Sequence, residues 1–174
     1  MPIFQTSIEI FCSYARADEV WQRKLETHLS LLKRQGLISL WHDRNIVPGT
    51  DWATAIDVHL EAASVILLLI SPDFFASDYC YGTELKRAME RHQANEARVL
   101  PILLRPVDWK GTPFEGLQVL PTGAKPITLW DNHDGALTDV AIGIRRVIEH
   151  LHSLSFPASP LSLPYLWNIE LPPV

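Results

Sequence analysis

The sequence predicts an α/β protein built on a doubly wound parallel sheet of five strands, with helices on both faces. Three observations support this class. Apolar, strand-like segments alternate five times with segments of helical periodicity, and the links between them are short. The central run Val65–Ile70 is apolar throughout, as expected for a strand covered by helices on both faces of its sheet. The predicted fold is therefore flavodoxin-like.

The first strand is predicted over residues 7–15, a short apolar segment rich in β-branched and aromatic side chains. Asp18 is the expected N-cap of the following helix, residues 19–36, in which apolar residues recur at spacings of three and four. Gly36 ends that helix. A second, shorter strand is predicted over residues 37–43.

The middle of the chain repeats the same pattern. A Pro-Gly turn precedes a helix that Thr50 or Asp51 can cap and that runs to about Ala63. The third strand covers residues 64–71, and a helix is predicted over residues 72–93.

The last third contains the two remaining strands. The fourth is predicted over residues 98–107, although Pro101 removes one donor from its ladder. A loop rich in Gly and Pro leads to a fifth strand over residues 125–130. An amphipathic helix over residues 136–154 closes the domain.

One domain is therefore predicted over residues 1–154. Residues 155–174 form a Pro-rich C-terminal tail, since five of the 13 prolines fall within the last 18 residues. Such a composition is typical of a linker or a docking arm.

The composition excludes several classes of partner. The net charge is −5, and the 15 Lys and Arg form no block longer than two, so no nucleic-acid surface is expected. The longest wholly apolar run has six residues and is too short to cross a membrane. No signal peptide is visible, and two cysteines without a framework of spacings suit a reducing cytosol. A cytoplasmic domain without a membrane or nucleic-acid partner is expected.

Topology predicts where a site would lie. In a sheet of order 2-1-3-4-5, ligands bind between the carboxyl ends of the first and third strands. The segments leaving these strands are 12–18 and 71–84, so Glu84 should face the turn after the first strand. At about 100° per residue, Glu84 lies at the margin of its helix's apolar face. A solvated Glu84 paired with Arg87 is the structural alternative.

Other chemistries lack their motifs. The chain has no glycine-rich phosphate loop and no G-x-S-x-G nucleophile elbow. The acidic residues of a phospho-acceptor receiver domain are missing after the first and third strands. His42, His59 and the two cysteines lack metal-ligand spacing, so no metal site is predicted.

Four stretches, in order, resemble the Toll/interleukin-1 receptor (TIR) domain family, of the prokaryotic kind. They are "FCSYARAD", "WHDRNIVPGTDW", "SVILLLISPDFFASDYCYGTELKRAMERH" and "VLPILLRPVDW". The resemblance covers about residues 7–152, and it implies a parallel sheet of order 2-1-3-4-5.

The resemblance also implies an activity. Many prokaryotic and plant TIR domains cleave NAD⁺ at the nicotinamide–ribose bond with a glutamate that matches Glu84. NAD⁺ is then the substrate, and no cofactor is expected. Nicotinamide leaves as a neutral base and the transition state resembles an oxocarbenium ion, so one carboxylate suffices. Ser13, Tyr14 and Arg16 would line the crevice near the ribose and phosphates, with Arg16 on the diphosphate.

The loop 43–52, here called the flap loop, would act as a mobile flap and an association surface, and a simple Pro-Gly turn is the structural alternative. Asp43 and Trp52 at its ends, together with Cys80, complete the expected substrate-binding set. Many members that cyclise the product carry tryptophan where this chain has Cys80, and Tyr79 or Tyr81 is the candidate replacement for its aromatic surface. Both ADP-ribose and a cyclic ADP-ribose isomer are therefore open as products.

Two classes of function follow from the resemblance. One is an NAD⁺ glycohydrolase in anti-phage defence or cell death, activated by self-association through TIR–TIR contacts. The other is a non-catalytic TIR scaffold that recruits partners. The tail resembles linkers to a nucleotide-binding oligomerisation module, which would be a C-terminal partner domain.

Overall fold

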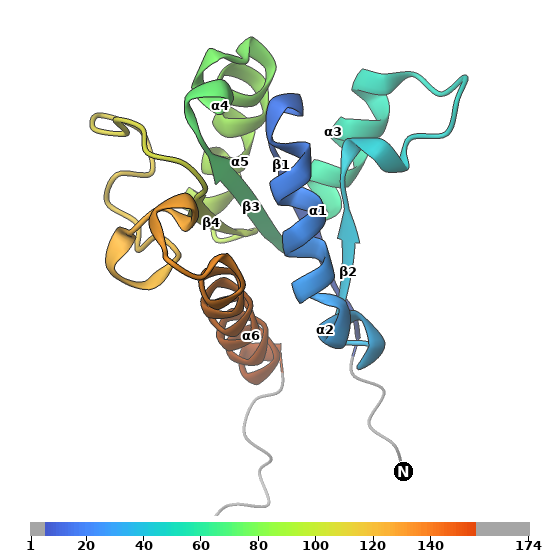
Figure 1. Cartoon of the computed structure of the whole chain (residues 1–174). Helices are drawn as coiled ribbons and strands as arrows, with labels where there is room; N and C mark the ends of the chain where they lie inside the picture. Colours follow the sequence, from blue (N-terminus) through green and yellow to red (C-terminus); the bar gives the residue numbers. More distant parts are fainter. Residues whose placement is uncertain (1–5, 156–174) are drawn as a thin grey trace, which may run out of the picture.

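The computed structural model describes residues 6–155. Its sheet is parallel throughout, and its strands lie in the order β2-β1-β3-β4 (Figure 1). The strands are β1 (Ile8–Ser13), β2 (Ile38–Trp41), β3 (Val65–Ile70) and β4 (Arg98–Leu103). The reversal of chain direction along the sheet therefore falls between β1 and β3, as predicted.

Helices cover both faces, which confirms the doubly wound class (Figure 1). The helices are α1 (Glu19–His28), α2 (Ser30–Arg34), α3 (Trp52–Ala62), α4 (Pro72–Ala76), α5 (Leu85–Gln93) and α6 (His133–Ser155). Alternate strand residues serve the two cores. Ile10 and Leu67 pack with α1, α2 and α6, whereas Phe11 and Ile66 pack with α3, α4 and α5. β3 is fully buried because it contributes to both cores.

The prediction of a fifth strand over residues 125–130 is wrong. This segment contains a 3₁₀ helix, Ile127–Leu129, and one backbone bond, from Thr128 N to Leu104 O at 3.1 Å, joins it to the segment after β4. The loop before it occupies part of the sheet edge instead, because Leu120 forms an isolated parallel bridge with Ile102. Pro126 lacks an N–H, which disfavours a ladder at the predicted position.

Two predicted helices are divided. The first breaks at Leu29 into α1 and α2. The helix predicted over residues 72–93 consists of α4, a π-helical segment Asp78–Glu84, and α5. The fourth strand ends at Leu103, earlier than predicted, and α6 begins at His133, before the predicted start.

Within residues 6–155 there is no helix with the length and apolar character that a membrane span requires. The predicted C-terminal tail lies outside the described residues, apart from Ser155 at the end of α6.

Candidate active site

The π-helical segment places Glu84. Ser77 caps this segment by accepting a 3.2 Å hydrogen bond from Cys80 N, and Leu85 N donates to Cys80 O in the i→i−5 pattern. Such wide turns are frequent at functional sites. The wider winding turns Glu84 inward, so it is 6% exposed and not at the margin of an apolar face. The predicted alternative pair with Arg87 is absent, because Arg87 pairs with Glu61 and Glu90.

The Glu84 carboxyl faces the end of β1. Its Oε2 atom is buried and has no hydrogen-bond partner among the described residues, and the same holds for Ser13 Oγ. Ser13 forms no bond of standard geometry, yet its hydroxyl lies close enough to lower the pKa of Glu84. Buried polar atoms without partners of standard geometry cost free energy in a folded protein, so their occurrence at the end of β1 makes this place a candidate ligand site.

Burial dominates the protonation of Glu84. Desolvation raises the pKa of its carboxyl from 4.5 to about 7, and the negative charge of Asp43 adds to the rise. The Ser13 hydroxyl opposes it in part. A carboxyl of this kind gains or loses its proton near neutral pH, which is typical of catalytic acids and bases.

Cys80 connects the Glu84 segment to the turn after β1. Its Sγ donates a hydrogen bond of 3.4 Å to Tyr14 O. Burial, and next the charge of Glu84, raise the pKa of the Cys80 thiol to about 11, so it stays neutral. Cys12 and Cys80 are both buried and free.

Tyr14 joins that turn to the start of the flap loop. Its hydroxyl donates to Asp43 Oδ1 at 2.8 Å and accepts from Arg44 Nε at 3.2 Å. Burial and the Asp43 carboxylate raise the pKa of the Tyr14 phenol above its usual range. The structure thus brings Ser13, Tyr14, Asp43 and Cys80 together around Glu84.

Arg44 was not predicted as a site residue. Its guanidinium donates to the buried Gln22 side chain and to Glu26 Oε2, and so ties the flap loop to α1. The sequence did offer one indication of its role, because Arg44 directly follows Asp43 in the predicted flap loop.

An aromatic pair lies near the other end of the flap loop. The rings of Trp52 and Tyr79 are 4.4 Å apart with an interplanar angle of 51°. Burial and the charge of Glu84 raise the pKa of Tyr79 to about 12, so its phenol lies within electrostatic range of that carboxyl. Tyr81 instead packs on Phe75 at 5.5 Å and is 42% exposed. Of the two tyrosine candidates, the structure places Tyr79 beside the flap loop.

Arg16 stands apart from this group. It begins a one-turn 3₁₀ helix, Arg16–Asp18, and is exposed, without an ion pair in the part of the chain that the structure describes. The next polar contact in this region belongs to Asp18, which is buried and accepts hydrogen bonds from Ser71 and Arg105. This second group fixes the carboxyl ends of the strands and was also not predicted.

No group of three or more His, Cys, Asp or Glu residues suited to a metal ion occurs within residues 6–155. Surface hollows along β4 and α6, and between α1 and the start of α6, do not include Glu84 in their lining. Glu84 is buried in this structure, so a ligand can reach its carboxyl only after neighbouring residues move.

Comparisons with known proteins bear on the family and the fold. A family model described as the TIR domain matches residues 10–140. An uncharacterized protein of Sinorhizobium fredii, y4lF, is 52% identical over 136 residues, or 78% of this chain and 42% of that protein. The chain thus spans less than half the length of that curated relative.

Solved structures of the same architecture match as well. The TIR domain of the Toll-related receptor TRR-2 from Hydra magnipapillata has a TM-score of 0.59 and 23% identity, with 80% of this chain and 97% of that one covered. The TIR domains of the activated Roq1 resistosome, which recognises the pathogen effector XopQ, have a TM-score of 0.47 and 18% identity, with 86% and 100% covered. The first of these supports the fold.

Proposed function

The chain belongs to the TIR domain family, and we propose that it cleaves the bond between nicotinamide and ribose in NAD⁺. One observation carries this proposal. A buried carboxyl, Glu84, lies beside Ser13 at the carboxyl end of β1, with one oxygen unpartnered among the described residues. A scaffold that worked by surface contacts would have no use for such a group, which costs stability.

The chemistry needs little beyond this carboxylate. Nicotinamide is already a good leaving group because it departs from a pyridinium as a neutral base, so no general acid is required. The ribose develops positive charge at its anomeric carbon, as in glycoside hydrolysis. A carboxylate held in a water-poor site stabilises that charge strongly, since its field is weakly screened there. Water, or a nucleophile within the same substrate, then completes the reaction, and the product is ADP-ribose or a cyclic isomer.

The neighbouring residues suit the substrate. The Ser13 hydroxyl and the Glu84 carboxyl can bind the ribose hydroxyls, since both lack partners of standard geometry. Arg16 is exposed and unpaired in the described chain, so its guanidinium is available to a diphosphate. The Trp52–Tyr79 pair offers an aromatic surface for a planar ring.

Glu84 is buried, so the substrate needs a route to it, and the proposed route is a movement of the flap loop triggered by self-association. The loop presents Val47, which is 68% exposed, and it leads to Trp52, which is 45% exposed. Apolar side chains at the tip of a loop favour contact with a second copy of the domain. Packing of a neighbour against this loop would hold it away from the closed arrangement.

The wider setting is also proposed. Because the chain covers 42% of its curated relative, further domains are expected in a full-length protein, and an oligomerisation module after the tail would cluster these domains. Loss of NAD⁺ in the cytoplasm would then serve anti-phage defence or cell death.

A non-catalytic scaffold is the second candidate, and the exposed Val47 and Trp52 favour it equally. To separate the two, dispersed and artificially clustered protein is incubated with NAD⁺ and nicotinamide release is followed. If the protein is an enzyme, nicotinamide release should rise with clustering and be lost in Glu84→Gln. If the protein is a scaffold, the wild type and Glu84→Gln should both self-associate, and neither should release nicotinamide.

A further inference from the structure

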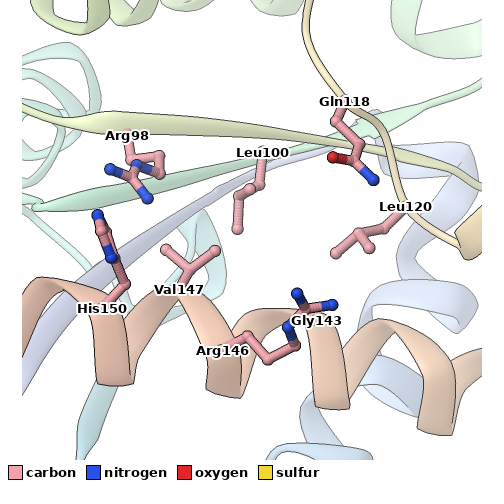
Figure 2. Close-up of a pocket in the computed structure, with 8 residues that line it drawn as sticks. All are labelled: Arg98, Leu100, Gln118, Leu120, Gly143, Arg146, Val147 and His150. Atoms are coloured by element: carbon pink, nitrogen blue, oxygen red, sulfur yellow. The ribbon is translucent and has the colours of Figure 1, made fainter.

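A separate hollow lies between β4 and α6, far along the fold from Glu84 (Figure 2). Its volume is about 430 Å³, within the range of small-molecule pockets. Arg98 begins β4, so the hollow is near the amino end of that strand, whereas Glu84 lies by the carboxyl ends of β1 and β3. We call it the β4–α6 pocket.

The wall of this pocket is cationic. Arg98, Arg146 and His150 line it, and none of its lining residues is acidic. Neither guanidinium forms an ion pair within residues 6–155, and Figure 2 shows His150 rising from α6 toward Arg98. Burial, and then the charge of Arg98, lower the pKa of the nearby His92, as expected where that charge is not neutralised. Uncompensated positive charge is notable in a chain whose net charge is −5.

The floor of the pocket is apolar. Leu100 and Val147 point into the space between sheet and helix, Leu120 closes one end, and the Gln118 amide hangs over the same end (Figure 2). Gly143 lies on α6 at the same end of the pocket, where its lack of a side chain leaves room for Leu120. A Cβ there would stand 2.7 Å from a Leu120 methyl, so any larger residue would push Leu120 aside.

The missing fifth strand explains why the space exists. Leu120 pairs with β4 through bonds to Leu103 N at 2.8 Å and to Pro101 O at 2.9 Å, and the pairing stops there. Among the described residues, the beginning of β4, from Arg98 to Leu100, therefore has no outer strand, and α6 faces it on the side of the pocket.

We propose that the β4–α6 pocket binds a phosphorylated small molecule that carries an apolar or planar body, of about mononucleotide size. Its phosphate contacts Arg98 and His150 at one end of the pocket, because a guanidinium matches phosphate oxygens in geometry and charge, and Arg146 at the Gly143 end adds a second positive charge to the wall (Figure 2). Its body lies on the leucine and valine side chains of the floor. This proposal does not depend on NAD⁺ cleavage, since no residue of the Glu84 site takes part.

Calorimetric titration of the whole chain with AMP tests the proposal, beside titrations with adenosine and with inorganic phosphate. We expect AMP to bind at least ~10-fold more tightly than either fragment, and to weaken as salt is raised. Arg98→Gln with Arg146→Gln should reduce AMP affinity at least ~10-fold. Inorganic phosphate binding as tightly as AMP would overturn the proposal, as would AMP affinity unchanged by these substitutions.

Three further variants make the result specific. Arg145→Gln removes the same charge from the adjacent position of α6, where Arg145 donates to Gln35, and should leave AMP affinity unchanged. Gly143→Ala keeps both guanidinium groups but drives Leu120 toward the hollow, and should weaken AMP binding. Trp52→Ala should have no effect, because it alters only the Glu84 side. AMP binding that depended on Trp52 and not on Arg98 would overturn the proposal.

Discussion

The Tyr14 hydroxyl donates a 2.8 Å hydrogen bond to Asp43 Oδ1, and this bond ties the turn after β1 to the first residue of the flap loop. The two residues are far apart in sequence, and Arg44 adds a second bond to the same hydroxyl at 3.2 Å. The start of the flap loop is therefore held by one phenol as well as by the contacts of Arg44 with α1.

Tyr14→Phe removes this hydroxyl and keeps the ring. Asp43 then loses its partner, so the free energy of unfolding should fall by about 1 kcal/mol, as measured by urea denaturation. Tyr81→Phe is the matched control, because Tyr81 is exposed and makes ring contacts with Phe75. Equal losses in the two variants would show that the Tyr14 hydroxyl does not hold the loop.

The raised pKa of Glu84 makes stability depend on pH. The folded protein keeps the Glu84 proton up to about pH 7, whereas the unfolded chain releases it near 4.5, so rising pH destabilises the fold between these values. Glu84→Gln stays neutral and should be more stable than the wild type by at most ~3 kcal/mol above pH 8. The difference should vanish below pH ~4.5. Thermal melts at several pH values test this, and a constant difference at all pH values would contradict it.

Ser13→Ala should move the pH dependence of NAD⁺ cleavage. The Ser13 hydroxyl lowers the pKa of Glu84, and the ionised carboxylate is the active form, so its loss should shift the rising limb of activity to higher pH. The limb of the wild type is expected near pH 7. A reduced rate with an unmoved limb would mean that Ser13 acts on the substrate alone.

Arg105 should be among the residues most important for stability. It pairs with the buried Asp18 at 2.9 Å and also with Asp73, across the ends of the strands. Arg105→Ala leaves the Asp18 carboxylate without its cation, and should cost about 3 kcal/mol of unfolding free energy in urea. Arg23→Ala, which breaks the exposed pair with Glu19, should cost less than ~0.5 kcal/mol. Similar costs for both would refute this ranking.

Much of the fold follows from local patterns. The alternation of apolar runs with helical periodicity was enough to predict β1 to β4 and their helices, because buried parallel strands carry a strong sequence signal. The prediction of a fifth strand failed because residues 125–130 have a strand-like composition, whereas pairing with the sheet depends on contacts with residues distant in sequence. Leu120 pairs with the edge of β4, and Pro126, which lacks an N–H, disfavours pairing of residues 125–130 with the sheet.

The site was predicted in position but not in detail. Topology predicted that Glu84 faces the turn after the first strand, and in the structure its carboxyl lies beside Ser13 at the end of β1, although a calculation at 100° per residue put the carboxyl at a helix margin. The π-helical turn, which no periodicity reveals, buries it. Arg44 contacts α1, and Arg105 contacts Asp18. Both contacts join residues distant in sequence, so no local pattern of the sequence predicts them.

The most direct test compares nicotinamide release by clustered wild-type, Glu84→Gln and Glu90→Gln proteins at pH 8 under single-turnover conditions. Glu90 lies on α5 and pairs with Arg87 at the surface, so its change controls for the loss of a charge. Release should fall at least ~10²-fold in Glu84→Gln, because the stabilising charge is gone, and stay unchanged in Glu90→Gln. Equal release by wild type and Glu84→Gln would contradict the proposed role of this carboxylate.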